Sequence, residues 1–242
     1  MPRTSRAARL FICFVLVCGL SALGYGILQG VSLHYFRFLT MLAIALVASR
    51  LKLKLPGLNG TMSINLPFIL IAVVELSSFE ALMIALASTL VQCLPKDRGK
   101  PKAVQTLFNV STMAVAVGLA GRIFQGGVPP STASVAGSQL LVLAAATFFV
   151  IQTIPVATII SLTEGGNALR IWSSIVHLSF PYYVLSAGIT SLVTVSSHRM
   201  GWQVPLLLLP TMYGVYRSFR LYFGRGETLG RPITLARAAG IQ

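Results

Sequence analysis

Long apolar blocks, separated by short polar and basic stretches, run through almost the whole chain. We distinguish eight of them, at about residues 10–28, 38–48, 64–77, 79–94, 104–124, 139–162, 171–195 and 204–223. A helix needs roughly 20 apolar residues to cross the hydrocarbon core of a bilayer, and several blocks approach or exceed that length. The blocks lack the alternation of polar and apolar positions that a membrane β-barrel requires. We therefore expect an all-α, polytopic transmembrane helical bundle.

The third and fourth segments are short, and they are joined by the sequence Glu75-Leu76-Ser77-Ser78-Phe79-Glu80. We expect them as two thin spans or as one re-entrant hairpin, and both arrangements leave the flanking basic loops on the same side. A single helix from residue 65 to residue 94 would put the basic residues 50–54 and 96–102 on opposite sides and would bury both glutamates. We therefore reject a continuous helix.

The distribution of lysine and arginine predicts the side of the membrane that each loop occupies. If the N-terminus is inside, all of the 19 basic residues fall on the cytoplasmic side except Arg37, Arg122 and Arg199. This bias follows the positive-inside rule and places the C-terminus inside as well. The net charge of +14 therefore reflects topology, and we expect no nucleic-acid partner.

The overall composition supports a single domain in lipid. Hydrophobic residues make up 55% of the chain and charged residues 10%, whereas a soluble domain carries roughly 25% charged residues. The arginines ahead of the first apolar block favour an uncleaved signal anchor. We expect residues 1–223 to form one transmembrane domain and residues 224–242 to form a short basic cytoplasmic tail.

Residue types that carry catalysis in membrane enzymes are nearly missing from the spans. Asp97 is the sole aspartate and lies in a basic loop, and Cys13, Cys18 and Cys93 have the spacing of neither a zinc site nor a redox pair. The sequence contains no metalloprotease, nucleophile-elbow or Walker A motif. We expect a non-enzymatic protein without a metal site or a cofactor.

Polar residues at membrane depth are costly in lipid and usually face the bundle interior or a cavity. Asn65, Gln92, Gln105, Asn109 and His177 lie toward the cytoplasmic side, and Gln152 lies deeper. Together with Tyr182, which follows Pro181, these candidates for ligand binding are named the inner belt. Pro181 is expected to kink the helix beside Tyr182 and to free backbone carbonyls. The alternative is that the amides form interhelical hydrogen bonds of about 0.6 kcal/mol each and that His177 is a satisfied interior histidine.

On the outer side, the carboxylates are Glu75 and Glu80, and the cations are Arg37, Arg122 and Arg199. We expect Arg122 to pair with Glu75 or Glu80, which would leave a nearly neutral face. The alternative is an acidic mouth that attracts a cationic ligand.

Small residues recur at close helical spacing in the fourth and fifth segments. They would allow close helix approach, either inside the bundle or against a partner membrane subunit. These residues are Ala81, Ala85 and Ser88, and Ala114, Gly118 and Gly121.

The stretch from Leu55 to Gln125 carries a family resemblance. It begins Leu55-Pro-Gly-Leu-Asn-Gly-Thr-Met-Ser-Ile-Asn-Leu, passes through the turn at 75–80 and a basic loop, and continues as Val104-Gln-Thr-Leu-Phe-Asn-Val. This pattern resembles the integral-membrane sensor domain found ahead of diguanylate cyclase and HD-GYP phosphodiesterase domains in bacteria. The resemblance implies a bacterial cytoplasmic (inner) membrane location and output to cytoplasmic domains. Residues 224–242 are too few for such a domain, so the output would pass to a signalling partner.

Our leading hypothesis is a non-enzymatic, sensor-like membrane domain that binds an unknown small ligand or a signal in the bilayer. The second hypothesis is a small-solute transporter or a substrate-capture subunit of an energy-coupling-factor type transporter, which are also small helical membrane domains. The third is a structural partner that docks through its small residues.

Overall fold

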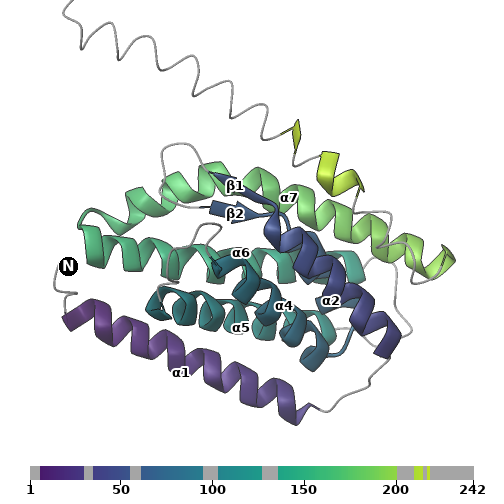
Figure 1. Cartoon of the computed structure of the whole chain (residues 1–242), viewed down its shortest axis with the longest axis horizontal. Helices are drawn as coiled ribbons and strands as arrows, with labels where there is room; N and C mark the ends of the chain where they lie inside the picture. Colours follow the sequence, from purple (N-terminus) through teal and green to yellow (C-terminus); the bar gives the residue numbers. More distant parts are fainter. Residues whose placement is uncertain are drawn as a thin grey trace, which may run out of the picture.

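The computed structural model describes residues 6–29, 35–54, 61–94, 103–126, 136–200, 210–214 and 217–218. A short β-ribbon connects the second and third of its main helices (Figure 1). In chain order the elements are α1 (Arg6–Leu28), α2 (Tyr35–Arg50), β1 (Lys52–Lys54), β2 (Thr61–Ser63), α3 (Leu66–Glu75), α4 (Ser78–Cys93), α5 (Ala103–Gly126), α6 (Ala136–Glu164) and α7 (Ala168–Met200).

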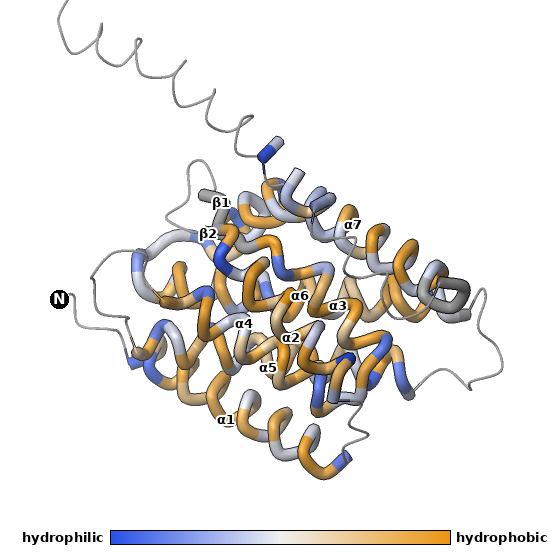
Figure 2. Tube along the Cα trace, turned by 45° about the vertical axis from the view of Figure 1, so that its right-hand side comes forward, coloured by the Kyte–Doolittle hydropathy of each residue, from blue (hydrophilic) through white to orange (hydrophobic). Residues whose placement is uncertain are grey.

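Among the described residues, four helices are long and apolar enough to cross a membrane, namely α1, α5, α6 and α7. They run along the long axis of the molecule (Figure 1), and apolar residues extend along much of their length (Figure 2). Large apolar side chains on α1 are exposed, with Leu10 at 72% and Leu20 at 67%. Such side chains fit a lipid environment, and the protein is a multi-pass helical membrane protein.

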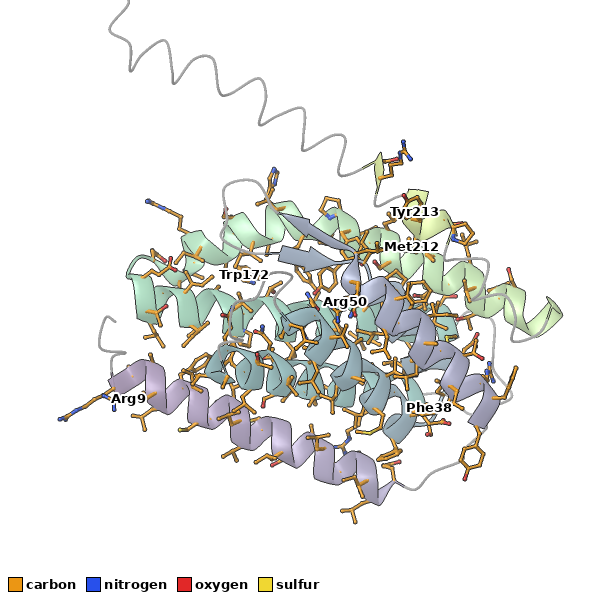
Figure 3. The ribbon with its side chains drawn as sticks, viewed as in Figure 1. Arg9, Phe38, Arg50, Trp172, Met212 and Tyr213 are labelled. Atoms are coloured by element: carbon orange, nitrogen blue, oxygen red, sulfur yellow. The ribbon has the colours of Figure 1, made fainter. Side chains whose placement is uncertain are left out.

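The expected segments agree with the observed helices for the first seven blocks, with ends that differ by a few residues. The all-helical class is confirmed for the body of the molecule, while the number of membrane crossings stays a prediction. The eighth block, 204–223, lies largely outside the described residues, which include two short helical pieces at 210–214 and 217–218. Within the first of these, Met212 is buried in the hydrophobic core (Figure 3).

Helix α3 is the central element of the bundle. Every residue from Leu66 to Val73 is buried, and Phe68, Ile69 and Ala72 have no exposed surface. The helix contacts α2, α4, α5 and α7. A helix that is apolar on all faces fits either lipid or a protein core, and here the neighbouring helices cover it, so α3 forms the core of the bundle.

The chain breaks between α3 and α4, which confirms the rejection of one continuous helix. Leu76 is extended, and Ser77 caps α4: its side chain accepts from the Glu80 amide, while the Glu80 side chain accepts from the Ser77 amide. This reciprocal arrangement is a capping box, and it satisfies backbone donors that a helix start otherwise leaves unpaired. The break is therefore encoded by four consecutive residues, Ser77 to Glu80.

The ribbon formed by β1 and β2 was not predicted from the sequence. The strands are antiparallel, with Lys52 opposite Ser63 and Lys54 opposite Thr61. The Ile64 amide donates to the Leu51 carbonyl at 3.3 Å, which extends the pairing to the start of α3. The ribbon thus returns the chain from the end of α2, where Arg50 lies (Figure 3), to the beginning of the central helix.

Close helix contacts are made at small residues, as expected for packing in lipid. A Cβ atom added at Gly19 on α1 would lie 2.6 Å from the Ser111 Cβ atom on α5. The stripes on α4 and α5 are mostly buried where these helices pack together. At Gly118 an added Cβ would be 3.4 Å from Ala22 of α1. Within the described residues, both stripes therefore serve packing inside the chain.

Candidate functional site

Polar side chains from four helices meet at the turn between α3 and α4. Three are charged, and the others are hydroxyl and amide groups that bond to the turn itself. We call this set the tip cluster, and it comprises Arg37 of α2, Glu75 of α3, Ser77 and Ser78 at the start of α4, Glu80 of α4 and Gln125 of α5.

Arg37 and Glu75 provide the ionic contact of the tip cluster. The Arg37 Nη2 atom lies 2.6 Å from the Glu75 Oε2 atom, and the Glu75 side chain is only 5% exposed. A charge-assisted bond in such a setting is stronger than a solvent-exposed one. It fixes the beginning of α2 against the end of the central helix α3.

Gln125 joins the end of α5 to the same turn. Its Nε2 atom donates to the Val73 carbonyl at 3.3 Å and to the Leu76 carbonyl at 3.1 Å. Its Oε1 atom accepts from the Ser78 hydroxyl at 2.7 Å. One side chain therefore satisfies carbonyls that α3 leaves unpaired at its C-terminal end and a hydroxyl at the start of α4.

Glu80 is the most buried charged residue of the tip cluster, at 1% exposure. Its Oε2 atom accepts from the Ser77 amide at 2.9 Å and from the Ser77 hydroxyl at 2.8 Å. Its Oε1 atom is buried and has no hydrogen-bond partner among the described residues, and the same is true of Arg37 Nε. Buried polar atoms are nearly always bonded, so each of these two atoms could bind a further group.

The expected pairing of Arg122 with Glu75 or Glu80 is corrected by the structure. Arg122 of α5 lies over the Tyr25 ring of α1, with its Cζ atom 4.6 Å from the ring centroid. Arg37 pairs with Glu75, in the one ion pair that the described part of the chain contains. Arg122 is exposed on α5, and a cation over an aromatic face gains electrostatic energy without leaving solvent.

The inner belt residues occupy separate interhelical contacts. Asn65 is buried, and its Nδ2 atom donates to the Ser88 hydroxyl of α4 at 3.2 Å. Asn109 Nδ2 lies 3.6 Å from the Cys93 sulfur, and Gln152 Nε2 lies 3.4 Å from the Met113 sulfur. The three amides thus bridge α3 to α4, α5 to α4 and α6 to α5.

The remaining members of the inner belt are also dispersed. Gln105 and His177 are exposed, and Gln92 is half-buried. Tyr182 is buried on α7, where its phenol group bonds to the backbone of Leu66 at the start of α3. No single cluster of the inner belt is formed, and a ligand role for its members stays a prediction.

The region around Pro181 is an aromatic contact between α6 and α7. The rings of Phe149 and Tyr183 are 4.7 Å apart at an angle of 73°, and Phe180 packs against Phe149 from the same helix as Tyr183. Both Pro155 and Pro181 lie inside continuous helices. Trp172 Nε1 donates to Thr153 Oγ1 at 3.1 Å, so α6 and α7 are joined along their length.

Sequence reasoning named Glu75 and Glu80 but missed the roles of Arg37, Ser77, Ser78 and Gln125. The sequence Ser77-Ser78-Phe79-Glu80 matches the capping-box pattern, a local signal that could have placed Ser77 and Glu80 together. Arg37 and Gln125 are 38 and 49 residues from the atoms that they bind at Glu75 and Leu76, and the sequence carries no local signal for either contact.

Comparison with curated proteins and comparison with solved structures each give no match. Within the described residues, no group of three or more His, Cys, Asp or Glu side chains could hold a metal ion. A family model, MASE9, matches residues 14–222 and therefore includes every helix from α2 to α7 and most of α1. This match and the four membrane-compatible helices establish that the chain belongs to MASE9, a family of membrane-associated sensory domains.

Proposed function

We propose that this protein is a non-enzymatic sensor that detects a small ligand or ion at the tip cluster and passes the information to a cytoplasmic signalling partner. The observation that carries the proposal is the α3–α4 hairpin. Its turn is bonded to α2 and α5 by Arg37 and Gln125, while its other end leads into the β-ribbon and the basic loop. A group bound at the turn would act directly on the central helix.

Helices α3 and α4 are coupled at both ends of the hairpin. At the turn Gln125 bonds to the end of α3 and to the start of α4, and near the opposite end Asn65 donates to Ser88. Helix α4, with 16 residues, spans about 24 Å. Displacement of the turn would therefore be transmitted to the loop that follows α4, where four basic residues lie at 96, 98, 100 and 102.

The positive-inside bias supports the orientation that this proposal needs. It places the tip cluster toward the outer side of a bacterial cytoplasmic membrane and the basic loops at the cytoplasmic surface. Arg9 and Phe38 lie toward opposite ends of the long axis (Figure 3), as expected for the inner end of α1 and the outer end of α2. By the resemblance described above, the partner would be a diguanylate cyclase or an HD-GYP phosphodiesterase.

Thermal unfolding of the detergent-purified protein tests the proposal. A ligand present at 100 times its Kd stabilises the folded state by about 2.7 kcal/mol, so a panel of ions and metabolites should raise the unfolding midpoint for at least one compound. Gln125→Ala should weaken this response, because it loosens the tip cluster. An Asn109→Leu, His177→Leu double variant should retain it.

The outcomes distinguish the two candidate sites. A response that survives Gln125→Ala and disappears in the double variant would move the site to the inner belt. The absence of any ligand-dependent shift across the panel would count against a small-ligand sensor. No observation on the described residues favours the transporter hypothesis.

A further inference from the structure

Glu80 is the most deeply buried charged residue of the tip cluster. Its Oε2 atom is held at the turn by two bonds from Ser77, so Oε1 of the same carboxylate lies at the turn as well. Oε1 is buried without a hydrogen-bond partner among the described residues, in a side chain that is 1% exposed. A buried carboxylate oxygen in this state is strongly destabilising unless a proton or another positive group binds to it.

We propose that the tip cluster binds one monovalent cation, an alkali ion or ammonium, through Glu80 Oε1. This proposal deepens the proposed function. It rests on that function only for the statement that the bound cation is the signal that the protein detects. Among the charged groups of the tip cluster, Arg37 and Glu75 neutralise each other in their ion pair, and Glu80 leaves one negative charge. One monovalent cation balances that charge.

The other charged groups nearby do not supply the missing positive charge. Arg122 of α5 is engaged with the Tyr25 ring. The Arg37 guanidinium is already bound to Glu75, and its unpartnered Nε atom is a donor that takes no part in holding a cation. The N-terminal end of α4 contributes a partial positive charge, which offsets only part of the Glu80 charge.

The other oxygen atoms of the turn are of the kind that a hard, singly charged ion prefers. The Ser77 hydroxyl, the Gln125 amide oxygen and the carbonyls at the C-terminal end of α3 are all neutral oxygen atoms. Oxygen donors favour alkali and alkaline-earth ions over softer transition metals. Divalent ions in proteins are usually bound by more than one available carboxylate, whereas here Glu75 is committed to Arg37.

Thermal unfolding in salts of constant ionic strength tests the assignment. Sodium, potassium or ammonium chloride would replace N-methyl-D-glucamine chloride at fixed pH, with the full chain in detergent. The wild-type midpoint should rise and saturate with at least one of these cations. Glu80→Gln should abolish the cation-specific rise, because glutamine keeps the capping box but removes the charge. Glu164→Gln, on an exposed glutamate at the end of α6, is the matched control and should respond as wild type.

Calorimetric titration of the wild-type protein with each chloride salt provides a second measurement that depends on no variant. Heat of binding should saturate for at least one cation, and the affinity should fall by at least about tenfold in Glu80→Gln. Equal midpoints in all salts together with no binding heat would overturn the assignment. So would a cation response that persists in Glu80→Gln, or a midpoint that changes with pH and not with the cation when the series is repeated at a second pH. A metabolite response without a cation response would leave the sensor proposal intact while removing this one.

Discussion

Arg37 at the start of α2 and Glu75 at the end of α3 form an ion pair with an Nη2–Oε2 distance of 2.6 Å. The pair joins two helices whose other ends are connected through the β-ribbon. Helix α3 is therefore connected to α2 at both ends, by the ribbon at one end and by the ion pair at the other. These two connections hold the central helix in place. This relationship makes the ion pair both a structural contact and part of the proposed site.

The first prediction concerns this pair. Arg37→Met and Glu75→Gln should each lower the free energy of unfolding by about 1 to 3 kcal/mol, because each leaves a largely buried partner without its counter-charge. The double variant should lose less than the sum of the two. Chemical denaturation in detergent micelles, analysed as a double-mutant cycle, measures the coupling.

Arg50→Met is the control for loss of an arginine, since Arg50 is exposed at the other end of α2. It should change the stability by less than about 0.5 kcal/mol. Strict additivity of Arg37→Met and Glu75→Gln would show that the ion pair contributes nothing to the fold.

The second prediction concerns Gln125. Gln125→Ala removes two bonds to the end of α3 and one from Ser78, and should cost about 1 to 3 kcal/mol. Hydrogen exchange should accelerate at the backbone amides of the α3–α4 turn. Gln139→Ala, at an exposed position on α6, should leave both measurements unchanged. Unaltered exchange at the turn in Gln125→Ala would contradict the role of this side chain.

The third prediction concerns the contact of α1 with α5. Gly19→Ala should destabilise the protein by about 1 to 3 kcal/mol, because the new Cβ would lie 2.6 Å from Ser111 Cβ. Gly24→Ala is the matched control on the same helix, with no atom within 4 Å of the added Cβ. Equal unfolding midpoints for the two variants would show that α1 does not pack on α5 at this point.

The fourth prediction concerns the buried amide of Asn65. Ser88→Ala removes the hydroxyl that accepts from Asn65 Nδ2, and should cost about 0.6 to 1.7 kcal/mol, the range of interhelical hydrogen bonds in membrane proteins. Thermal unfolding compared with Ser173→Ala, at an exposed position on α7, measures the difference. A loss of several kcal/mol would indicate that Ser88 does more than align two helices.

The fifth prediction concerns topology. In a variant with Cys13, Cys18 and Cys93 replaced by alanine, a cysteine at Gln29 should react with a membrane-impermeant maleimide from outside intact cells. A cysteine at Glu164 should react only after the membrane is opened. Both positions are exposed at helix ends, so accessibility to solvent is comparable. The reverse labelling pattern would invert the positive-inside assignment and place the tip cluster in the cytoplasm.

Much of the fold could be predicted from the sequence, because hydropathy reports the environment of each segment. The bounds of the first seven segments were predicted from apolar length, and the break between the third and fourth from the positions of the basic residues; both agree with the structure. The ribbon was not expected, since its three-residue strands are too short to show a period.

The candidate site was predicted less well. The depth of a residue in the membrane follows from its place along a segment, and this grouped Asn65, Asn109 and His177 at one level, with Gln152 deeper. Which helices are neighbours, and which way each side chain points, does not follow from depth. The structure accordingly distributes these four residues over different contacts, with His177 exposed.

By itself the sequence determined the solvent and the local structure of this protein: apolar blocks that require lipid, and a capping box that ends one helix and begins the next. Tertiary structure alone decided that α3 is the central helix, that Glu75 pairs with Arg37 rather than Arg122, and that Glu80 is buried. The physical reason is that local backbone bonding and hydropathy act along the chain, whereas the lateral order of helices depends on side-chain packing between distant segments.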